Sequence, residues 1–328
     1  MVIIMGSKSR VKKLLRSKNT VLIVIIVAIV LFFYFSNNNF LGMGNLRGIM
    51  TSVSFVGVLC VGVTMLMIGG DVDLSTGAIA SFAGVFAGVL CNAGLPWPIA
   101  FVLTMLMGAV CGYINASFIN KLGMMGFITT IAMISIYQGF AVAITSGKSM
   151  QIYSVGFWTI GSIALWDFIP LPFVIMLFLM IVYSRVLSNT SFGRLIYMCG
   201  GNRRAVRLCG INPKRISNIL FVNNGVLAAI AGAILASRMH TASPDAGNSG
   251  SLDAITAVVL GGVSFSGGVG TMSGCLIGLL LVTVFNTGLT TIGFQSYWQF
   301  VVRGGVLLLA LFLDFVSTKA RSRVLANA

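Results

Sequence analysis

The six acidic residues of the chain are all aspartates, and they are the side chains best suited to chemistry. Asp71 and Asp73 follow a pair of glycines in the motif GGDVDLS at 69–75, and Asp253 lies at the start of a long apolar run. Carboxylates in such places could hydrogen-bond a polyhydroxylated solute, or they could accept the free amide protons of the next helix. Both interpretations stay open, and a structural cap or gate is favoured for Asp71 and Asp73.

Catalytic and metal sites that need several histidines are excluded, because the chain has a single histidine, His240. The cysteines are scattered, mostly through apolar runs, without metal-ligand spacing. The segment SGKS at 146–149 is similar to the end of a phosphate-binding loop, but Val142 stands where that loop requires a glycine. We therefore expect no catalytic residue, metal site or cofactor here, and any ATPase must be another chain.

The elements that hold these aspartates must lie in lipid. Of the 328 residues, 57% are hydrophobic and 8% are charged, and the mean hydropathy is +1.01. A transmembrane helix needs about 20 predominantly apolar residues. We predict an all-α, polytopic bundle of about ten transmembrane helices, at residues 20–36, 49–68, 75–92, 97–118, 126–145, 168–187, 217–237, 251–265, 271–291 and 294–315.

The basic residues predict the orientation of this bundle. The net charge of +15 could suggest nucleic acid, but the Lys and Arg residues cluster before the first span, after the sixth and after the tenth. This is the positive-inside pattern, so we expect both termini in the cytosol and no nucleic-acid partner. The predicted organisation is a basic tail at 1–19, one transmembrane domain at 20–318 with a cytosolic loop at 188–216, and a tail at 319–328.

Two junctions are too rich in glycine for ordinary loops, GGDVDLS at 69–75 and GGVSFSGG at 261–268. They predict discontinuous helices at Gly69-Gly70 and Gly261-Gly262. Unwound backbone inside a membrane must be buried in protein or line a wet cavity, and broken helices in corresponding halves indicate a transport path. The alternative is that the glycine pairs only allow tight helix packing. Asp253 would find a partner in Arg238 or Arg303.

The segment between the sixth and seventh spans predicts a short helix. Asn202 is a suitable N-cap, and Gly210 with Pro213 ends the helical pattern. The apolar residues of this helix form an expected edge that could contact lipid headgroups or a groove in a protein. That edge consists of Val206, Leu208 and Ile211.

Three motifs together resemble the permease subunits of bacterial ABC sugar importers, a group that includes ribose, xylose, galactose and autoinducer-2 systems. They are IGGDVDLSTG at 68–77, CGGNRRAVRLCGIN at 199–212 and LDAITAVVLGGVSFSGGVG at 252–270. The resemblance covers nearly the whole chain, from about residue 40 to about residue 318. Asp71 is an extra charge, because the family usually has Gly-Ile-Asp there, and residues 263–265 are Val-Ser-Phe where Thr or Ser-Leu is commoner.

The resemblance implies a permease of the bacterial inner membrane that imports a monosaccharide or similar polyol. It implies ATPase subunits that bind ATP and magnesium, a periplasmic sugar-binding protein, and a second permease copy or a sister permease. The family's coupling helix maps onto Gly201, Asn202, Ala205, Val206, Leu208, Gly210 and Ile211. The residues expected to line the substrate pathway are Thr64, Asp71, Asp73, Ser75, Asn115 and Asp253.

Two other functions stay open, an ion-driven secondary carrier with Asp71 or Asp73 as its coupling site, and a passive channel. Neither gives a reason for the short helix at 202–211.

Overall fold

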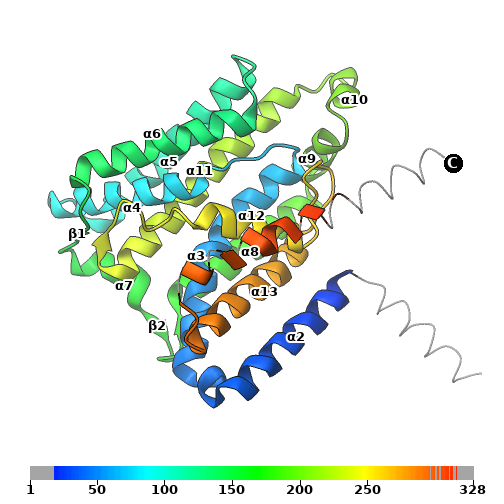
Figure 1. Cartoon of the computed structure of the whole chain (residues 1–328). Coiled ribbons are helices and arrows are strands. Elements are labelled where there is room, and N and C mark those ends of the chain that lie inside the picture. Colours follow the sequence, from blue (N-terminus) through cyan, green and yellow to red (C-terminus); the bar gives the residue numbers. More distant parts are fainter. Residues whose placement is uncertain are drawn as a thin grey trace, which may run out of the picture.

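A computed structural model of the chain describes residues 18–295, 297–299, 301–302, 304–309, 311–312 and 315. Its helices run between the two ends of one bundle (Figure 1). Among the described residues, six helices are long and apolar enough to cross a membrane: α3 (Met43–Ile68), α5 (Trp97–Asn120), α6 (Gly126–Thr145), α8 (Leu171–Asn189), α11 (Pro213–Met239) and α13 (Met272–Thr291). Shorter apolar helices include the apolar part, 20–36, of α2 (Lys18–Ser36), as well as α4 (Thr76–Asn92) and α12 (Gly250–Leu260). The chain is thus a multi-pass membrane protein.

The connecting elements distinguish the two ends of the bundle (Figure 1). Helices α9 (Ser191–Gly201) and α10 (Arg203–Leu208) lie at one end, which we call the α10 end. The opposite end, the β1 end, carries helix α7 (Val155–Ser162) and two small antiparallel sheets. Strand β1 (Met150–Gln151) pairs with β4 (Thr241–Ala242), and β2 (Ala164–Leu165) pairs with β3 (Ile169–Pro170). The 3-10 helix η1 (Asn38–Leu41) joins α2 to α3.

The predicted all-α bundle with interrupted helices is confirmed, with corrections at several ends. The span predicted at 251–265 is wrong at its C-terminal side, because α12 ends at Leu260 before the glycine pair. The span predicted at 217–237 is too short, because Asn212 caps α11 by accepting a hydrogen bond from the Lys214 amide (3.0 Å). The span predicted at 294–315 lies partly outside the described residues, as do the two tails.

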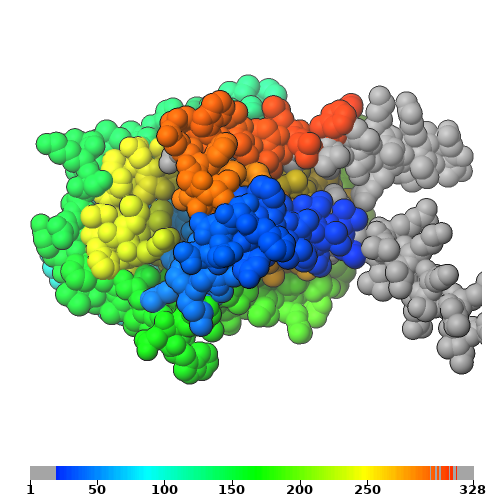
Figure 2. All heavy atoms as spheres, turned by 60° about the horizontal axis from the view of Figure 1, so that its bottom comes forward, coloured from blue at the N-terminus to red at the C-terminus, as the bar shows by residue number. Residues whose placement is uncertain are grey.

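Small residues set the packing of the bundle. Helix α11 packs against α3, α4 and α5. A Cβ atom on Gly225 would lie 2.1 Å from the Gly108 carbonyl oxygen, so the backbones of α11 and α5 are in direct contact. Helix α2 packs against α13 (Figure 2), and the centroid of the buried Phe33 ring lies 6.2 Å from that of the Phe285 ring.

Large apolar side chains cover the outside of the bundle. Exposed examples are Phe35 on α2, Leu106 on α5, Phe140 on α6 and Phe178 on α8. A surface of this kind is suited to lipid, because the polar backbone groups are satisfied within the helices beneath it.

Candidate functional site

Helix α3 ends at the first predicted break with a Schellman motif. The amide of Gly70 donates to the carbonyl of Met67 (3.0 Å), and the amide of Asp71 donates to that of Leu66 (3.1 Å). Gly70 has φ +81°, which is favourable for glycine and costly for other residues. The first glycine pair therefore ends the helix, as predicted, and an extended segment leads from Asp71 to α4.

Helix α12 ends at the second break in the same way. Gly262, with φ +94°, donates its amide to Val259 (2.9 Å), and Val263 donates to Val258 (3.1 Å). The two Gly-Gly motifs thus produce the same local structure at the same end of the bundle, although they lie almost 200 residues apart (261 minus 69).

The two breaks touch each other and the end of α9. The amide of Gly268 donates to the carbonyl of Ile68 (2.8 Å). A Cβ atom on Gly200 would lie 1.9 Å from the Ile68 oxygen and 2.3 Å from the Gly268 nitrogen. We call this contact of Ile68, Gly200 and Gly268 the glycine junction. The glycine junction therefore brings both breaks into contact with the end of α9, which is followed directly by α10.

Asp71 lies beside the glycine junction and pairs with Arg203, the first residue of α10. The Arg203 Nη2 atom is 2.7 Å from Asp71 Oδ2, and the Ser217 hydroxyl of α11 donates to the same oxygen (2.7 Å). Arg203 also donates to the carbonyls of Gly70 (3.2 Å) and Gly69 (3.4 Å). Asp71 therefore holds the extended segment that follows α3 against α10 and α11, and it does not cap α4.

Asp73 has a different environment, at the centre of a buried polar cluster. Its Oδ1 atom accepts from the amide (2.8 Å) and hydroxyl (2.6 Å) of Ser75. Its Oδ2 atom accepts from the side-chain amides of Asn224 (3.1 Å) and Asn115 (3.3 Å). All four residues are buried. Asp73 orders the turn that precedes α4 through Ser75, but it does not cap the helix, because the Gly77 amide of the first turn donates to the Ser251 hydroxyl (2.6 Å).

The cluster joins four helices and includes residues that the sequence reasoning missed. The Tyr137 hydroxyl of α6 donates to Asn115 Oδ1 on α5 (2.8 Å), and Asn224 of α11 donates to the Thr76 hydroxyl of α4 (3.0 Å). Asn224 and Tyr137 could be found from the sequence as polar side chains inside otherwise apolar predicted spans. Such side chains often form hydrogen bonds between membrane helices.

The six predicted pathway residues are thus only partly brought together. Asp73, Ser75 and Asn115 share the cluster, whereas Asp71 lies in its own ion pair. Thr64 is buried within α3, and Asp253 is buried in the first turn of α12.

A polar cavity of about 330 Å³ lies towards the β1 end. Both Asp253 and Arg238 line it, while the alternative partner Arg303 lies outside the described residues. The other lining residues, from α3, α13 and beyond, are Gly48, Ser52, Val56, Val282, Thr283, Asn286, Thr287, Thr290 and Gln299. Hydroxyl, amide and charged groups around a small cavity suit a small polar solute.

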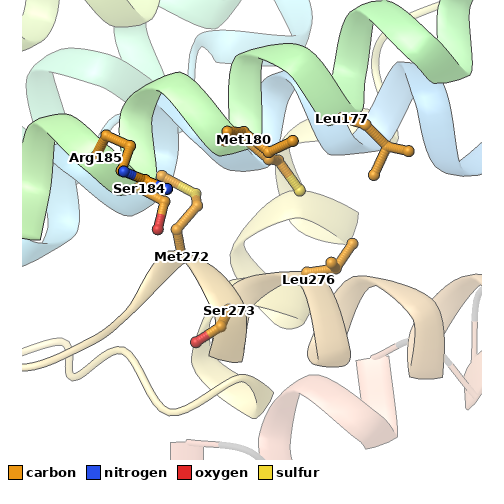
Figure 3. Close-up of a pocket in the computed structure, with 8 residues that line it drawn as sticks. Leu177, Met180, Ser184, Arg185, Met272, Ser273 and Leu276 are labelled. Atoms are coloured by element: carbon orange, nitrogen blue, oxygen red, sulfur yellow. The ribbon is translucent and has the colours of Figure 1, made fainter.

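A second cavity, of about 450 Å³, is a groove between α8 and α13 (Figure 3). Leu177 and Met180 of α8 face Leu276 of α13, and Ser184 and Arg185 lie near one end. Because most of its lining is apolar, this groove is a poor site for a polar solute.

The predicted short helix is present as α10. Asn202 Oδ1 accepts from the amides of Arg204 and Ala205 (3.0 Å each), and Gly210 has φ +79° after the last turn. The single apolar edge predicted for this helix is wrong. Val206 is 1% exposed and Leu208 is 90% exposed, because residues two apart lie on different faces of a helix.

The remaining residues predicted to couple to a partner surround this helix. Gly201 and Ala205 are exposed, whereas Ile211 is half-buried. Leu208, Gly201 and Ala205 are therefore accessible to another chain, and Val206 instead anchors α10 to its own bundle.

Comparisons with known proteins give consistent matches. Residues 45–311 match the family described as branched-chain amino acid transport system / permease component. The ribose import permease protein of Bacillus subtilis is 37% identical over 285 residues, which cover 84% of this chain and 86% of that protein. The Escherichia coli K12 ribose import permease protein is 34% identical over 282 residues, 84% of this chain and 87% of that protein. The xylose transport system permease protein of Haemophilus influenzae is 30% identical over 341 residues, 85% of this chain and 91% of that protein. No solved structure matches the chain.

Proposed function

We propose a function on the basis of family membership. This chain belongs to the family described as branched-chain amino acid transport system / permease component. The chain is a transport permease subunit and not an enzyme. We infer that it carries a monosaccharide or similar polyol across the bacterial inner membrane by alternating access. The observation that carries this proposal is the similarity to ribose and xylose permeases along at least 84% of the chain.

We propose that the α10 end faces the cytosol and binds ATPase subunits, which hold the ATP and magnesium. The exposed leucine of α10 supports this proposal, because Leu208 at 90% exposure has an apolar side chain that a partner would cover. A periplasmic sugar-binding protein would then dock at the β1 end. A second permease copy or a sister permease would complete the complex.

In this proposal the solute enters from the β1 end, through the cavity that Asp253 lines. The hydroxyl and amide groups of that cavity support a polyol, whose hydroxyls donate and accept hydrogen bonds. The cluster around Asp73 is buried on all sides, so it would act as a closed layer in this conformation.

Uptake into vesicles tests the proposed function. The permease is reconstituted with its ATPase and binding protein, and labelled ribose and xylose are supplied. We expect uptake only when ATP is present on the ATPase side. Uptake that continues without ATP would contradict the proposal, and its loss on collapse of an ion gradient would identify a secondary carrier.

A zwitterionic amino acid is a second candidate solute. The cavity at the β1 end has one basic and one acidic lining side chain, Arg238 and Asp253, which complement a carboxylate and an ammonium group. Labelled leucine therefore belongs in the same uptake panel. Uptake of leucine but not of pentoses would replace the sugar proposal.

The ATPase-binding role of α10 has a separate test. We expect Leu208→Asp to abolish co-purification of the ATPase, because a charge would be buried at the interface, while the permease still inserts and folds. Leu122→Asp is the matched control, since Leu122 is also exposed (69%) and lies in the turn between α5 and α6. Normal co-purification with Leu208→Asp would remove the proposed contact.

A further inference from the structure

An ion pair joins α10 to the first helix break, although its partners are 132 residues apart in the chain (203 minus 71). The Arg203 and Asp71 side chains are 39% and 10% exposed, and their N–O distance is 2.7 Å. A short, charge-assisted hydrogen bond of this kind is stronger than a neutral one, and partial burial reduces its screening by salt.

Arg203 also completes the end of α3. The last carbonyls of a helix have no partner within the helix, and a positive charge there is favourable. Arg203 donates to the carbonyl of Gly69, the C-cap of α3, and to that of Gly70, the residue after it. One guanidinium group therefore belongs both to the beginning of α10 and to the end of α3.

Both sides of this contact are firmly held. On one side, Asn202 caps α10 and the buried Val206 anchors it. On the other side, Asp71 is held by the Ser217 hydroxyl and stands two residues before Asp73. A displacement of α10 is thus applied to Asp71, and through a short extended segment to the buried polar cluster.

We propose that Asp71 and Arg203 are positioning residues that transmit movement of α10 to the first helix break. The proposal rests on the proposed function, because it takes the partner ATPase as the source of that movement. It assigns a role to the first aspartate of the motif at 68–77.

The first test measures solute taken up per ATP hydrolysed by the complete reconstituted complex. We expect Asp71→Asn and Arg203→Gln each to lower this ratio about tenfold while the ATPase still co-purifies. The double variant should match either single variant, because both act through one contact. Arg203→Lys keeps the charge and should retain most of the ratio. The control is Arg185→Gln, at an exposed arginine of α8 outside the proposed ATPase-binding helix, with a change of less than about twofold.

Losses that multiply in the double variant, or ratios equal to that of the wild type, would overturn the proposal. If a variant fails to assemble with the ATPase, the second test decides for that variant, because it needs the permease alone.

That second test uses Cys199, which precedes Gly200 at the glycine junction. Cys199 is 3% exposed, and burial raises the pKa of its thiol, so both factors slow its reaction with N-ethylmaleimide. We expect labelling of Cys199 to be about tenfold faster in both Asp71→Asn and Arg203→Gln, as α9 separates from the break. Because Asp71 raises and Arg203 lowers the pKa of this thiol, an effect through the pKa alone would have opposite signs in the two variants. The exposed Cys209 should react at one rate in all variants.

Unchanged labelling of Cys199 in both variants would overturn the proposal. The two tests also separate the two proposals. If wild-type uptake does not require ATP, the proposed function fails, whereas the labelling result still decides whether the ion pair holds α9 and α10 against the first break.

Discussion

The two helix breaks begin with the same backbone structure and are held in different ways. In both, the second glycine of a Gly-Gly pair adopts positive φ, and the same two hydrogen bonds close the helix. The first break then places two carboxylates, Asp71 and Asp73, among partners from α5, α10 and α11. The second break, at 261–271, has no charged residue. The same helix end can therefore begin a charge-dependent contact or a neutral one.

The second break relies on its backbone and on neutral contacts. Gly267 and Gly268 have φ +80° and +70°, and the amide of Ser264 donates to the Val269 carbonyl (3.0 Å). The Tyr197 hydroxyl of α9 donates to the Gly270 carbonyl of this break (2.8 Å). We expect this break to be sensitive to added side-chain volume and insensitive to charge, and the first break to be sensitive to charge.

The largest effect is expected at Gly200, where both breaks meet α9. A Cβ atom there would collide with the backbone of each break, and backbone cannot move aside as a flexible side chain can. We expect Gly200→Ala to destabilise the protein by ~3 kcal/mol or more. Thermal unfolding of the detergent-solubilised protein measures this effect.

The neighbouring glycine supplies the control. Nothing lies within 4 Å of a Cβ atom on Gly201. Gly201→Ala should be neutral or stabilising by up to ~1 kcal/mol, because alanine favours the helix. Equal unfolding temperatures for the two variants would show that the breaks do not meet at Gly200.

A somewhat smaller effect is expected within the first break. Asp73→Ala removes the acceptor for Asn115 and Asn224 and leaves their buried amides without this partner, which should cost ~2–3 kcal/mol. Asp245→Ala also removes an acceptor, of the Gln138 side-chain amide, but at an exposed site, and should cost less than ~1 kcal/mol. If chemical denaturation gives the two variants the same stability, the cluster around Asp73 does not hold α4 to its neighbours.

Charge-independent sensitivity of the second break is tested at Gly268. Gly268→Ala should lower the stability by ~2 kcal/mol. Its Cβ atom would lie 2.9 Å from the Gly201 nitrogen, and the positive φ would strain the alanine backbone as well. Gly293→Ala isolates the strain, since Gly293 has φ +80° in open space, and should cost ~1 kcal/mol. The difference in stability between the Gly268→Ala and Gly293→Ala variants should persist at high salt. If it disappears at high salt, the contact at the second break depends on charge.

The sequence predicts the local features of this comparison because those features depend on a few adjacent residues. A Gly-Gly pair after an apolar helix predicts the break, and Asn202 before Arg203 predicts the beginning of α10. The hydrogen-bond partners of the two carboxylates could not be predicted in this way, because they are distant in the sequence. Ser217 is 146 residues from Asp71, and Asn224 is 151 residues from Asp73. Only the packing of α11 against the first break brings them together.

Helix α10 shows the same division. Asn202 and Gly210 predict the ends of this helix, whereas the sequence pattern places its apolar residues on one edge. Because α10 is only six residues long, periodicity over so few positions could not separate Val206 from Leu208. The position of the bundle relative to α10 decides which of the two is buried.

The smallest expected effect concerns the beginning of α10, which bears on the first break alone. Asn202→Ala should weaken the first turn of α10 by ~1 kcal/mol, because the amides of Arg204 and Ala205 lose their acceptor, while the unfolding temperature of the bundle changes little. Hydrogen exchange should show faster exchange of these two amides, and Asn202→Asp should restore protection. Because Arg203 follows the cap directly, the fraying should also speed the labelling of Cys199 next to the glycine junction. Faster exchange with unchanged labelling would mean that the first break is held independently of the order of α10.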